Sequence, residues 1–167
     1  MLRIGESFEG DGANSAHVTL LLGPNALLAG AFALAASSPG PGHVPFQVVL
    51  KPNRAVQPAT LFIAKAALRN ARHERLTWGP AQAGVAAGMT RAVLEAVLPA
   101  GAQTAWLAIA LVWVDAEADD PELIYAHNKA ATLVAARRAF QDHEATPAEL
   151  TAAFASIGNP YFTPARP

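Results

Sequence analysis

The ten residues from Ala105 to Val114, AWLAIALVWV, constrain the fold more than any other stretch, because they are the most hydrophobic run in the chain. A membrane-spanning helix needs about 20 such residues, so this run is too short to cross a bilayer. It is long enough for a strand that is covered on both faces. The sequence therefore predicts a sheet with Ala105–Val114 near its centre.

Two long helical patterns flank this run. The first is expected to open at Gly79-Pro80, with proline in the first turn, and to end before Pro99; Gly84 and Gly88 leave room in it for another backbone. Asp120-Pro121 opens the second with a capping carboxylate followed by proline. The residues expected to face inward are Val85, Met89, Val93 and Val97 in the first helix, and Leu123, Ile124, Ala131 and Val134 in the second.

The remaining elements complete one α/β (α+β) unit that spans residues 1–167 as a single domain, without an internal repeat or a linker. Their periodicity and their bounding Gly, Pro and Asn residues set their limits. The expected strands are Leu2–Phe8, His17–Gly23, Phe46–Leu50 and Thr60–Ala66, and the expected further helices are Ala26–Ser37, Asn70–Leu76 and Pro147–Ile157.

Composition excludes several classes of protein. The chain has no cysteine, which removes disulfides and thiol nucleophiles and leaves a cytoplasmic location as the expectation. A formal charge of −1, with 15% charged residues, gives no basic surface for nucleic acid. Hydrophobic residues make up 52% of the chain, more than a small monomer needs, so a homo-oligomer is expected.

Neither a signal peptide nor a membrane anchor is expected. Glu6, Glu9 and Asp11 occupy the region where a signal peptide would carry its apolar run. The segment Val18–Ala36 is nearly apolar, but Gly23-Pro24 divides it into two halves of different period. It is interpreted as a strand, a turn and a helix.

The GxxxxGK[ST], HExxH, GxSxG and GxGxxG motifs are absent, and no two of the five histidines stand at metal-ligand spacing, so no bound metal is expected. His73 and His143 lie among charged residues and are interpreted as structural or surface residues. His127 is interpreted as a partly buried helix residue, and His43 as a loop hydrogen-bonder or part of a site. His17 begins a predicted buried strand directly after a flexible polar turn, GDGANSA, and is equally consistent with a presented reactive group or an ordinary strand residue.

A resemblance to known proteins distinguishes between the two interpretations of His17. Five phrases between about Ile4 and Ala139 resemble, in order and spacing, the formaldehyde-activating enzymes of one-carbon metabolism. Asn159-Pro160-Tyr161 resembles the aromatic ending of that family more weakly. The phrases are IGESFEGDGANSAHVTLLLGP, GHVPFQVVLKPN, PATLFIAKA, WGPAQAGVAAGM and DDPELIYAHNKAATLVAARRA. A match of this length and order is more specific than any single motif.

The resemblance implies a mixed sheet with helices packed on one face, similar to the second domain of ribosomal protein S5. It also implies a homopentamer with active sites between subunits, and condensation of formaldehyde with tetrahydromethanopterin, the co-substrate, without a metal. In the family, the histidine matching His17 is the general acid, and residues matching Lys65 and Gln82 line the pterin site. Histidine suits this role, since its unperturbed pKa lies nearest neutrality. Trp78 or Phe46 is a candidate for stacking on the pterin.

Three residues depart from the family pattern. Thr19 stands where the family has a pterin-binding aspartate, Gln47 where it has leucine, and Ala67 where it has threonine. Thr19 shares a strand face with His17, because strand residues two apart point to the same side. These changes keep open a second interpretation, in which a non-catalytic paralogue binds a one-carbon carrier or a formaldehyde adduct as a sensor or interaction partner.

Overall fold

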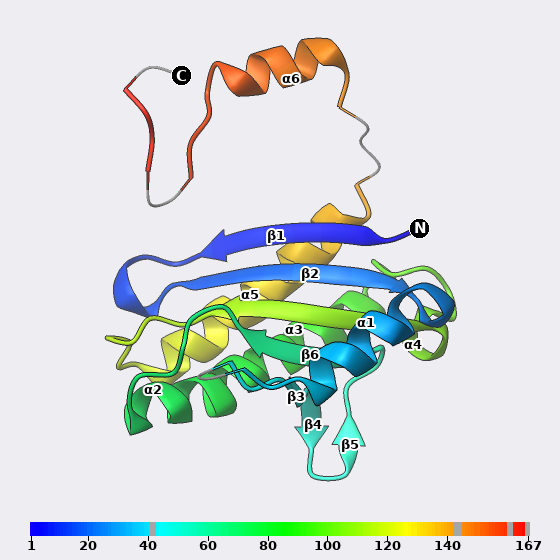
Figure 1. The fold of residues 1–167 in the computed structure, drawn as a ribbon, viewed down its shortest axis with the longest axis vertical. Coiled ribbons are helices and arrows are strands. Elements are labelled where there is room, and N and C mark those ends of the chain that lie inside the picture. Colours follow the sequence, from blue (N-terminus) through cyan, green and yellow to red (C-terminus); the bar gives the residue numbers. More distant parts are fainter. Residues whose placement is uncertain (41–42, 142–144, 160–161, 166–167) are drawn as a thin grey trace.

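The computed structural model describes residues 1–40, 43–141, 145–159 and 162–165 of the 167-residue chain. Among these residues, five strands form one sheet in the order β1-β2-β7-β6-β3 (Figure 1). Neighbouring strands run antiparallel except β6 and β7, which are parallel. The strands are β1 (Arg3–Glu9), β2 (Ala16–Pro24), β7 (Trp106–Trp113), β6 (Ala59–Ala64) and β3 (Phe46–Gln47). The predicted mixed sheet with the hydrophobic run at its centre is confirmed.

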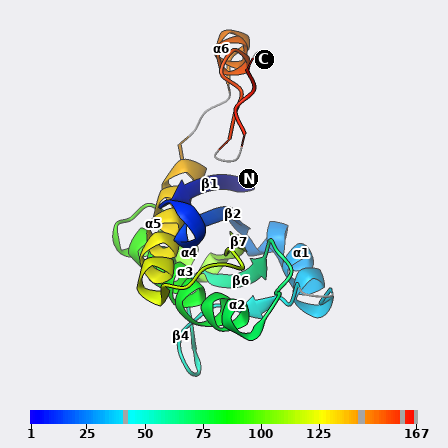
Figure 2. The same cartoon turned by 90° about the vertical axis from the view of Figure 1, so that its left-hand side faces the viewer.

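Helices pack on this sheet as predicted, and they cover it unequally. Figure 2 shows α3 (Gln82–Leu94) and α5 (Pro121–Ala139) on one side and α1 (Asn25–Ser37) on the other. The main core lies between the sheet and α3 and α5, whereas α1 packs over Leu61 and Ile109 on the opposite face. That opposite face is therefore partly covered at one end. The closer likeness to ribosomal protein S5 stays a prediction.

The two large helices pack closely because α3 carries glycine at the contact. A Cβ on Gly84 would lie 2.7 Å from the Tyr125 carbonyl oxygen, and one on Gly88 would lie 2.6 Å from that of Lys129. Both distances are too short for a side chain. The room that the sequence predicted at these glycines is thus filled by the backbone of α5. Asp120 caps α5 as predicted, accepting hydrogen bonds from the amides of Glu122 and Leu123.

Several predicted boundaries were wrong. The strand expected over Phe46–Leu50 divides into β3 and β4 (Val49–Lys51), and β4 forms a hairpin with β5 (Arg54–Ala55). Pro80 lies inside a helical segment that runs from α2 (Ala71–Leu76) through a π-helical turn, Thr77–Ala81, into α3. The wider turn accommodates a residue without an amide donor. Leu123, expected inward, is 42% exposed because it lies on the outer side of the first turn of α5.

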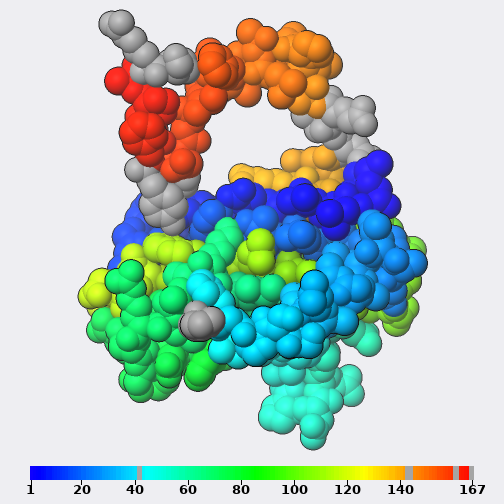
Figure 3. All heavy atoms as spheres, in the orientation of Figure 1, coloured from blue at the N-terminus to red at the C-terminus, as the bar shows by residue number. Residues whose placement is uncertain are grey.

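The carboxyl-terminal residues form an arm that stands apart from the sheet (Figures 1 and 3). Helix α6 (Pro147–Phe154) begins with a capping box in which Thr146 and Glu149 satisfy each other's backbone amides. Every residue from Ala145 to Asn159 is exposed. Leu150, Phe154 and Ile157 are among them, so the arm offers apolar side chains without cover from its own chain.

No helix within the described parts of the chain is both long and apolar enough to cross a membrane. Helix α1 has thirteen residues and β7 has eight, so each falls short of a membrane span. His143 and Tyr161, to which the sequence drew attention, lie outside the described residues.

Candidate active site

His17 and Thr19 project from β2 on the face opposite α3 and α5, as the two-residue period of a strand predicts. The intervening residues Ala16, Val18 and Leu20 point the other way and are completely buried in the main core. His17 pairs across the sheet with Phe8 on β1 and with Trp113 on β7. Packing of the alternate residues thus fixes the direction of the His17 and Thr19 side chains.

Lys65 joins this pair from two strands away. It follows the last residue of β6 and continues the pairing with β7, since its amide donates to the Val112 carbonyl at 2.7 Å. Its side chain extends across β7, so that Nζ lies 2.7 Å from Thr19 Oγ1 and 3.1 Å from His17 Nε2. The alternative that Lys65 is an ordinary strand-edge lysine is wrong, because its amine sits in the middle of the face.

Glu6 completes the group, and sequence reasoning missed it as a site residue. It lies opposite Thr19 in the β1–β2 pairing, and its Oε1 contacts His17 Nε2. The two consecutive predicted strands can pair as a hairpin, and strand alternation then puts Glu6 and His17 on the same face. This pairing was the sequence signal that could have identified Glu6. Glu6, His17, Thr19 and Lys65 are called the His17 cluster below.

The cluster combines partial burial with opposing charges. The His17 side chain is 21% exposed and that of Glu6 is 60% exposed. Partial burial lowers the pKa of Lys65 from its ordinary value, while the Glu6 carboxylate acts in the opposite direction. The amine of Lys65 therefore loses its proton more readily than that of a solvated lysine.

The polar turn before His17 is anchored rather than flexible. The Asn14 amide donates to Asp119, and its side-chain oxygen accepts from the backbone amides of Asp119 and Asp120 at the start of α5. His127 Nδ1 bonds the Asn14 carbonyl at 2.8 Å. These bonds hold the turn against α5 and give His17 a rigid support.

Gln82 and Gln47 do not join the His17 cluster. Gln82 lies at the start of α3, where its Oε1 accepts the Val49 amide at 2.6 Å. Gln47 pairs with Leu61 and donates to the Thr60 carbonyl. Since Leu61 is four residues before Lys65 on β6, Gln47 stands about 13 Å along the sheet from the level of Lys65. Ala67 is exposed two residues beyond Lys65.

The aromatic candidates differ in availability. Phe46 stacks on Phe62, with ring centroids 4.7 Å apart, and packs against the main core. Trp78 is 47% exposed in the π-helical turn before α3. Trp78 thus has a free surface, whereas the Phe46 ring is already stacked.

The other described histidines have structural roles. His73 is 2% exposed, contrary to its expected solvated surroundings: Nε2 donates to the Val114 carbonyl at 2.9 Å and Nδ1 accepts the Arg69 amide at 3.3 Å. His43 is a loop hydrogen-bonder, donating from Nδ1 to the Ala64 carbonyl at 2.9 Å, next to Lys65. Within the described residues, no group of three potential ligands could hold a metal ion.

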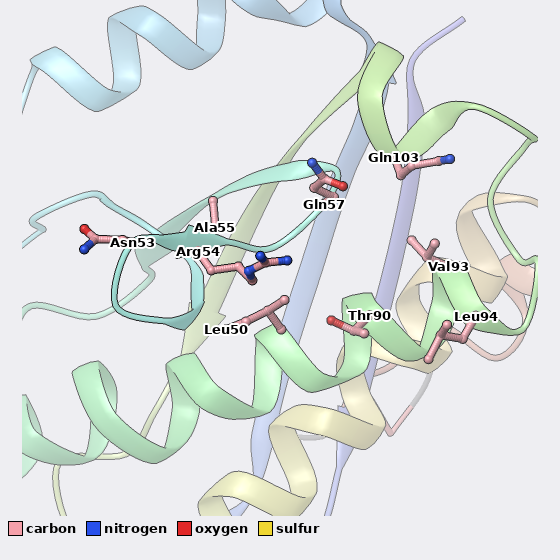
Figure 4. A pocket seen from close by; sticks show the side chains of 9 residues that line it. All are labelled: Leu50, Asn53, Arg54, Ala55, Gln57, Thr90, Val93, Leu94 and Gln103. Carbon is pink, nitrogen blue, oxygen red and sulfur yellow. The ribbon is translucent and has the colours of Figure 1, made fainter.

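A separate groove of about 440 Å³ lies between the β4–β5 hairpin, α3 and the short helix α4 (Ala102–Ala105), as Figure 4 shows. Leu50, Val93 and Leu94 are among its apolar lining residues, and its polar side chains are Asn53, Arg54, Gln57, Thr90 and Gln103. None of the His17 cluster lines it. The groove is large enough for a ligand, but its residues offer no acid and base pair.

Comparison with known proteins yields one family. The family model described as formaldehyde-activating enzyme matches residues 4–162. Similar relatives include bifunctional enzymes Fae/Hps of Archaeoglobus fulgidus, 36% identical over 141 residues, and Methanocella arvoryzae, 37% identical over 142 residues. Each alignment covers 84% of this chain and 36% of the relative, so the chain spans about a third of their length. A 5,6,7,8-tetrahydromethanopterin hydro-lyase of Methanosarcina barkeri is 34% identical over 139 residues, covering 83% of this chain and 78% of that protein.

Proposed function

Because the chain belongs to the formaldehyde-activating enzyme family, we propose that it condenses formaldehyde with tetrahydromethanopterin, or a related reduced pterin, to the methylene derivative and water. It would serve one-carbon metabolism and formaldehyde detoxification as a cytoplasmic carbon-oxygen lyase, with residues 1–167 acting as one domain. The observation that carries the proposal is the contact of Lys65 with both His17 and Thr19. The imidazole of His17, which can act as an acid or a base, and the amine of Lys65 thereby lie next to each other on an accessible face of the sheet.

The chemistry needs one proton donor and accurate positioning. Formaldehyde adds to one pterin nitrogen to form a carbinolamine, whose hydroxyl must leave as water before the second nitrogen closes the ring. His17 supplies the proton to that hydroxyl. Glu6 contacts His17 Nε2 and orients the imidazole for this transfer. Lys65 and Thr19 hold the polar edge of the pterin, which makes ring closure an intramolecular reaction.

A second copy of the chain would complete the site. Gln82 and Gln47, the other expected pterin contacts, lie away from the His17 cluster within one chain. Helix α1 has no charged residue, and of its thirteen described residues Leu28 alone is buried. An apolar helix with this much exposed surface indicates burial against a partner. We propose a homo-oligomer, a pentamer by the family resemblance, in which Gln82 and Gln47 of one copy face His17 of the next.

A specific observation favours the alternative of a non-catalytic carrier-binding paralogue. Thr19 accepts a hydrogen bond from Lys65, and its single hydroxyl replaces the two oxygens that a carboxylate would offer to a pterin. Gln47 already bonds the Thr60 carbonyl, and Ala67 has no hydrogen-bonding group. Loss of one such contact costs about 1 to 3 kcal/mol where the partner stays buried. Binding without turnover would identify this alternative.

The test measures condensation of formaldehyde with tetrahydromethanopterin spectroscopically, after subtraction of the spontaneous rate. Replacing His17 by alanine should lower the enzymatic rate ~10²-fold or more, the usual contribution of a general acid. His43→Ala is the matched control, because the His43 ring bonds the backbone carbonyl of Ala64, the residue before Lys65. A His17→Ala variant with the wild-type rate would disprove the role of His17.

The Thr19→Asp variant tests the departure from the family. An aspartate two residues after His17 would face Lys65 and offer two acceptors to the pterin, so KM for the pterin should fall about tenfold. An unchanged or higher KM would show that position 19 does not contact the pterin.

A further inference from the structure

We infer that Lys65 is the nucleophile that captures formaldehyde, forming a covalent adduct at Nζ before the one-carbon unit reaches a carrier. This inference rests on the proposed function for the identity of the aldehyde, and it replaces direct addition of formaldehyde to the pterin nitrogen by a prior covalent step at Lys65. A primary amine is the side-chain group that condenses reversibly with aldehydes, provided that it is neutral. The site must therefore keep the Lys65 amine neutral and supply an acid beside it.

The hydrogen-bonding geometry favours a neutral amine. A carboxylate only accepts hydrogen bonds, so the contact of Glu6 Oε1 with His17 Nε2 places a proton on that nitrogen. An ammonium at Lys65 would then point its protons at a donor. A neutral amine instead turns its lone pair toward the same Nε2–H, which Glu6 Oε1 and Nζ (3.1 Å from Nε2) then share as acceptors, and it donates to Thr19 Oγ1 at 2.7 Å. Partial burial lowers the pKa of Lys65 in the same direction.

The acid required for dehydration stands within reach. The Nζ lone pair attacks the formaldehyde carbon, the carbonyl electron pair moves to oxygen, and a proton passes from nitrogen to oxygen to give the carbinolamine. His17 Nε2 then donates its proton to the hydroxyl, the C–O bond breaks, and water leaves as the nitrogen lone pair forms the C=N bond. The product is a methylene iminium at Lys65, and the imidazole becomes neutral.

Transfer to the carrier restores the lysine. A carrier nitrogen attacks the methylene carbon and passes its proton to the neutral imidazole of His17, while the C=N electron pair returns to Nζ. Nζ then takes up a proton and leaves with the electrons of its C–N bond, as a second carrier nitrogen closes on the carbon and releases a proton. The net reaction remains formaldehyde plus carrier to methylene carrier plus water.

The chain provides its own controls, because it contains three lysines. Lys51 is exposed on β4, and Lys129 Nζ stands 5.9 Å from the centre of the Tyr125 ring on α5. Within the described residues, neither Lys51 nor Lys129 makes a hydrogen bond with a histidine. Selective reaction at Lys65 therefore reports on the His17 cluster, whereas reaction at all three reports general lysine chemistry.

The experiment is reductive trapping of the full-length protein with limiting ¹³C-formaldehyde and cyanoborohydride at neutral pH, without pterin. Hydride reduces the iminium to a labelled methylamine, which peptide mass spectrometry quantifies at each lysine. Lys65 should be labelled about tenfold faster than Lys51 and Lys129, and His17→Gln should remove that preference, since a general acid contributes ~10²-fold or more. Equal labelling of the three lysines, or a preference that survives in His17→Gln, would overturn the inference.

Parallel turnover assays separate this inference from the proposed function. Lys65→Arg keeps N–H donors that can orient a pterin but cannot form the iminium, so turnover should fall to the spontaneous rate. Wild-type turnover without preferential trapping at Lys65 would retain the proposed function and reject the covalent step. Preferential trapping without pterin turnover would retain the covalent step and favour the alternative of a formaldehyde-binding protein.

Discussion

At the scale of single residues, the His17 cluster depends on side chains whose surroundings alter their chemistry. Of its members, His17 and Thr19 follow from strand alternation, and Lys65 follows from the family resemblance. Glu6 was missed although the pairing of two consecutive predicted strands places it opposite Thr19. The contact of Lys65 across β7 was not predicted, because it depends on strand order, which one-dimensional spacing does not contain. The anchoring of the turn by Asn14 and His127 escaped for the same reason, since its partners are more than a hundred residues away.

The lowered pKa of Lys65 predicts a pH-dependent stability difference. The unfolded chain binds this proton more tightly than the folded protein, so the charge on Lys65 costs stability below the folded-state pKa. The cost disappears as pH rises toward the ordinary value of 10.5. Lys65→Met removes this charge and should therefore be more stable than wild type at pH 7. The difference in free energy of unfolding between the two proteins, measured in urea, should shrink between pH 7 and pH 10.5. A difference that stays constant with pH would contradict the shift.

The buried His73 predicts a stability loss without a change at the site. Its removal leaves the Val114 carbonyl and the Arg69 amide without their ring partners. His73→Ala should lower the free energy of unfolding by about 1 to 3 kcal/mol, the usual cost of an unsatisfied buried group. Thermal or urea unfolding measures it, with the exposed Arg72→Ala as control. Equal stability of the two variants would show that His73 contributes nothing.

At the scale of elements, the contact between α3 and α5 rests on two glycines. In Gly88→Ala the new methyl would lie 2.6 Å from the Lys129 carbonyl and 2.7 Å from Thr132 Cβ, so the helices must separate. Forced overpacking of this kind costs about 1 to 3 kcal/mol. Gly30→Ala is the matched control, since Gly30 lies in α1 with nothing near its Cβ position; it should be neutral or stabilising by up to about 1 kcal/mol. Denaturant unfolding of both variants tests the prediction, and a Gly88→Ala protein as stable as Gly30→Ala would refute it.

Elements with strong periodicity were predicted well, and those set by tertiary context were not. Strand β2, strand β7, α1 and α5 agree closely with expectation because their apolar patterns and caps are local. The β4–β5 hairpin was missed because its strands are short and its turn at Lys51-Pro52-Asn53 resembles a strand end. The start of α3 was misplaced because a π-helical turn carries Pro80 within the helix.

At the scale of the whole molecule, exposed apolar surface predicts association. Leu27 and Leu34 of α1 are 55% and 67% exposed, and a partner that covers them would remove this surface from water. Wild-type protein should sediment as an oligomer, near five times 17.4 kDa if pentameric. The double variant Leu27→Gln, Leu34→Gln should dissociate to smaller species, while Leu123→Gln, on α5 behind the sheet, should not. An unchanged mass for the double variant would place the interface elsewhere.

The most direct test of the account is the rate at which the wild-type protein condenses formaldehyde with tetrahydromethanopterin, compared with tetrahydrofolate and with the uncatalysed reaction. The account predicts a rate above background with tetrahydromethanopterin that requires both His17 and Lys65. A rate equal to background with both carriers, for a correctly folded oligomer, would contradict it.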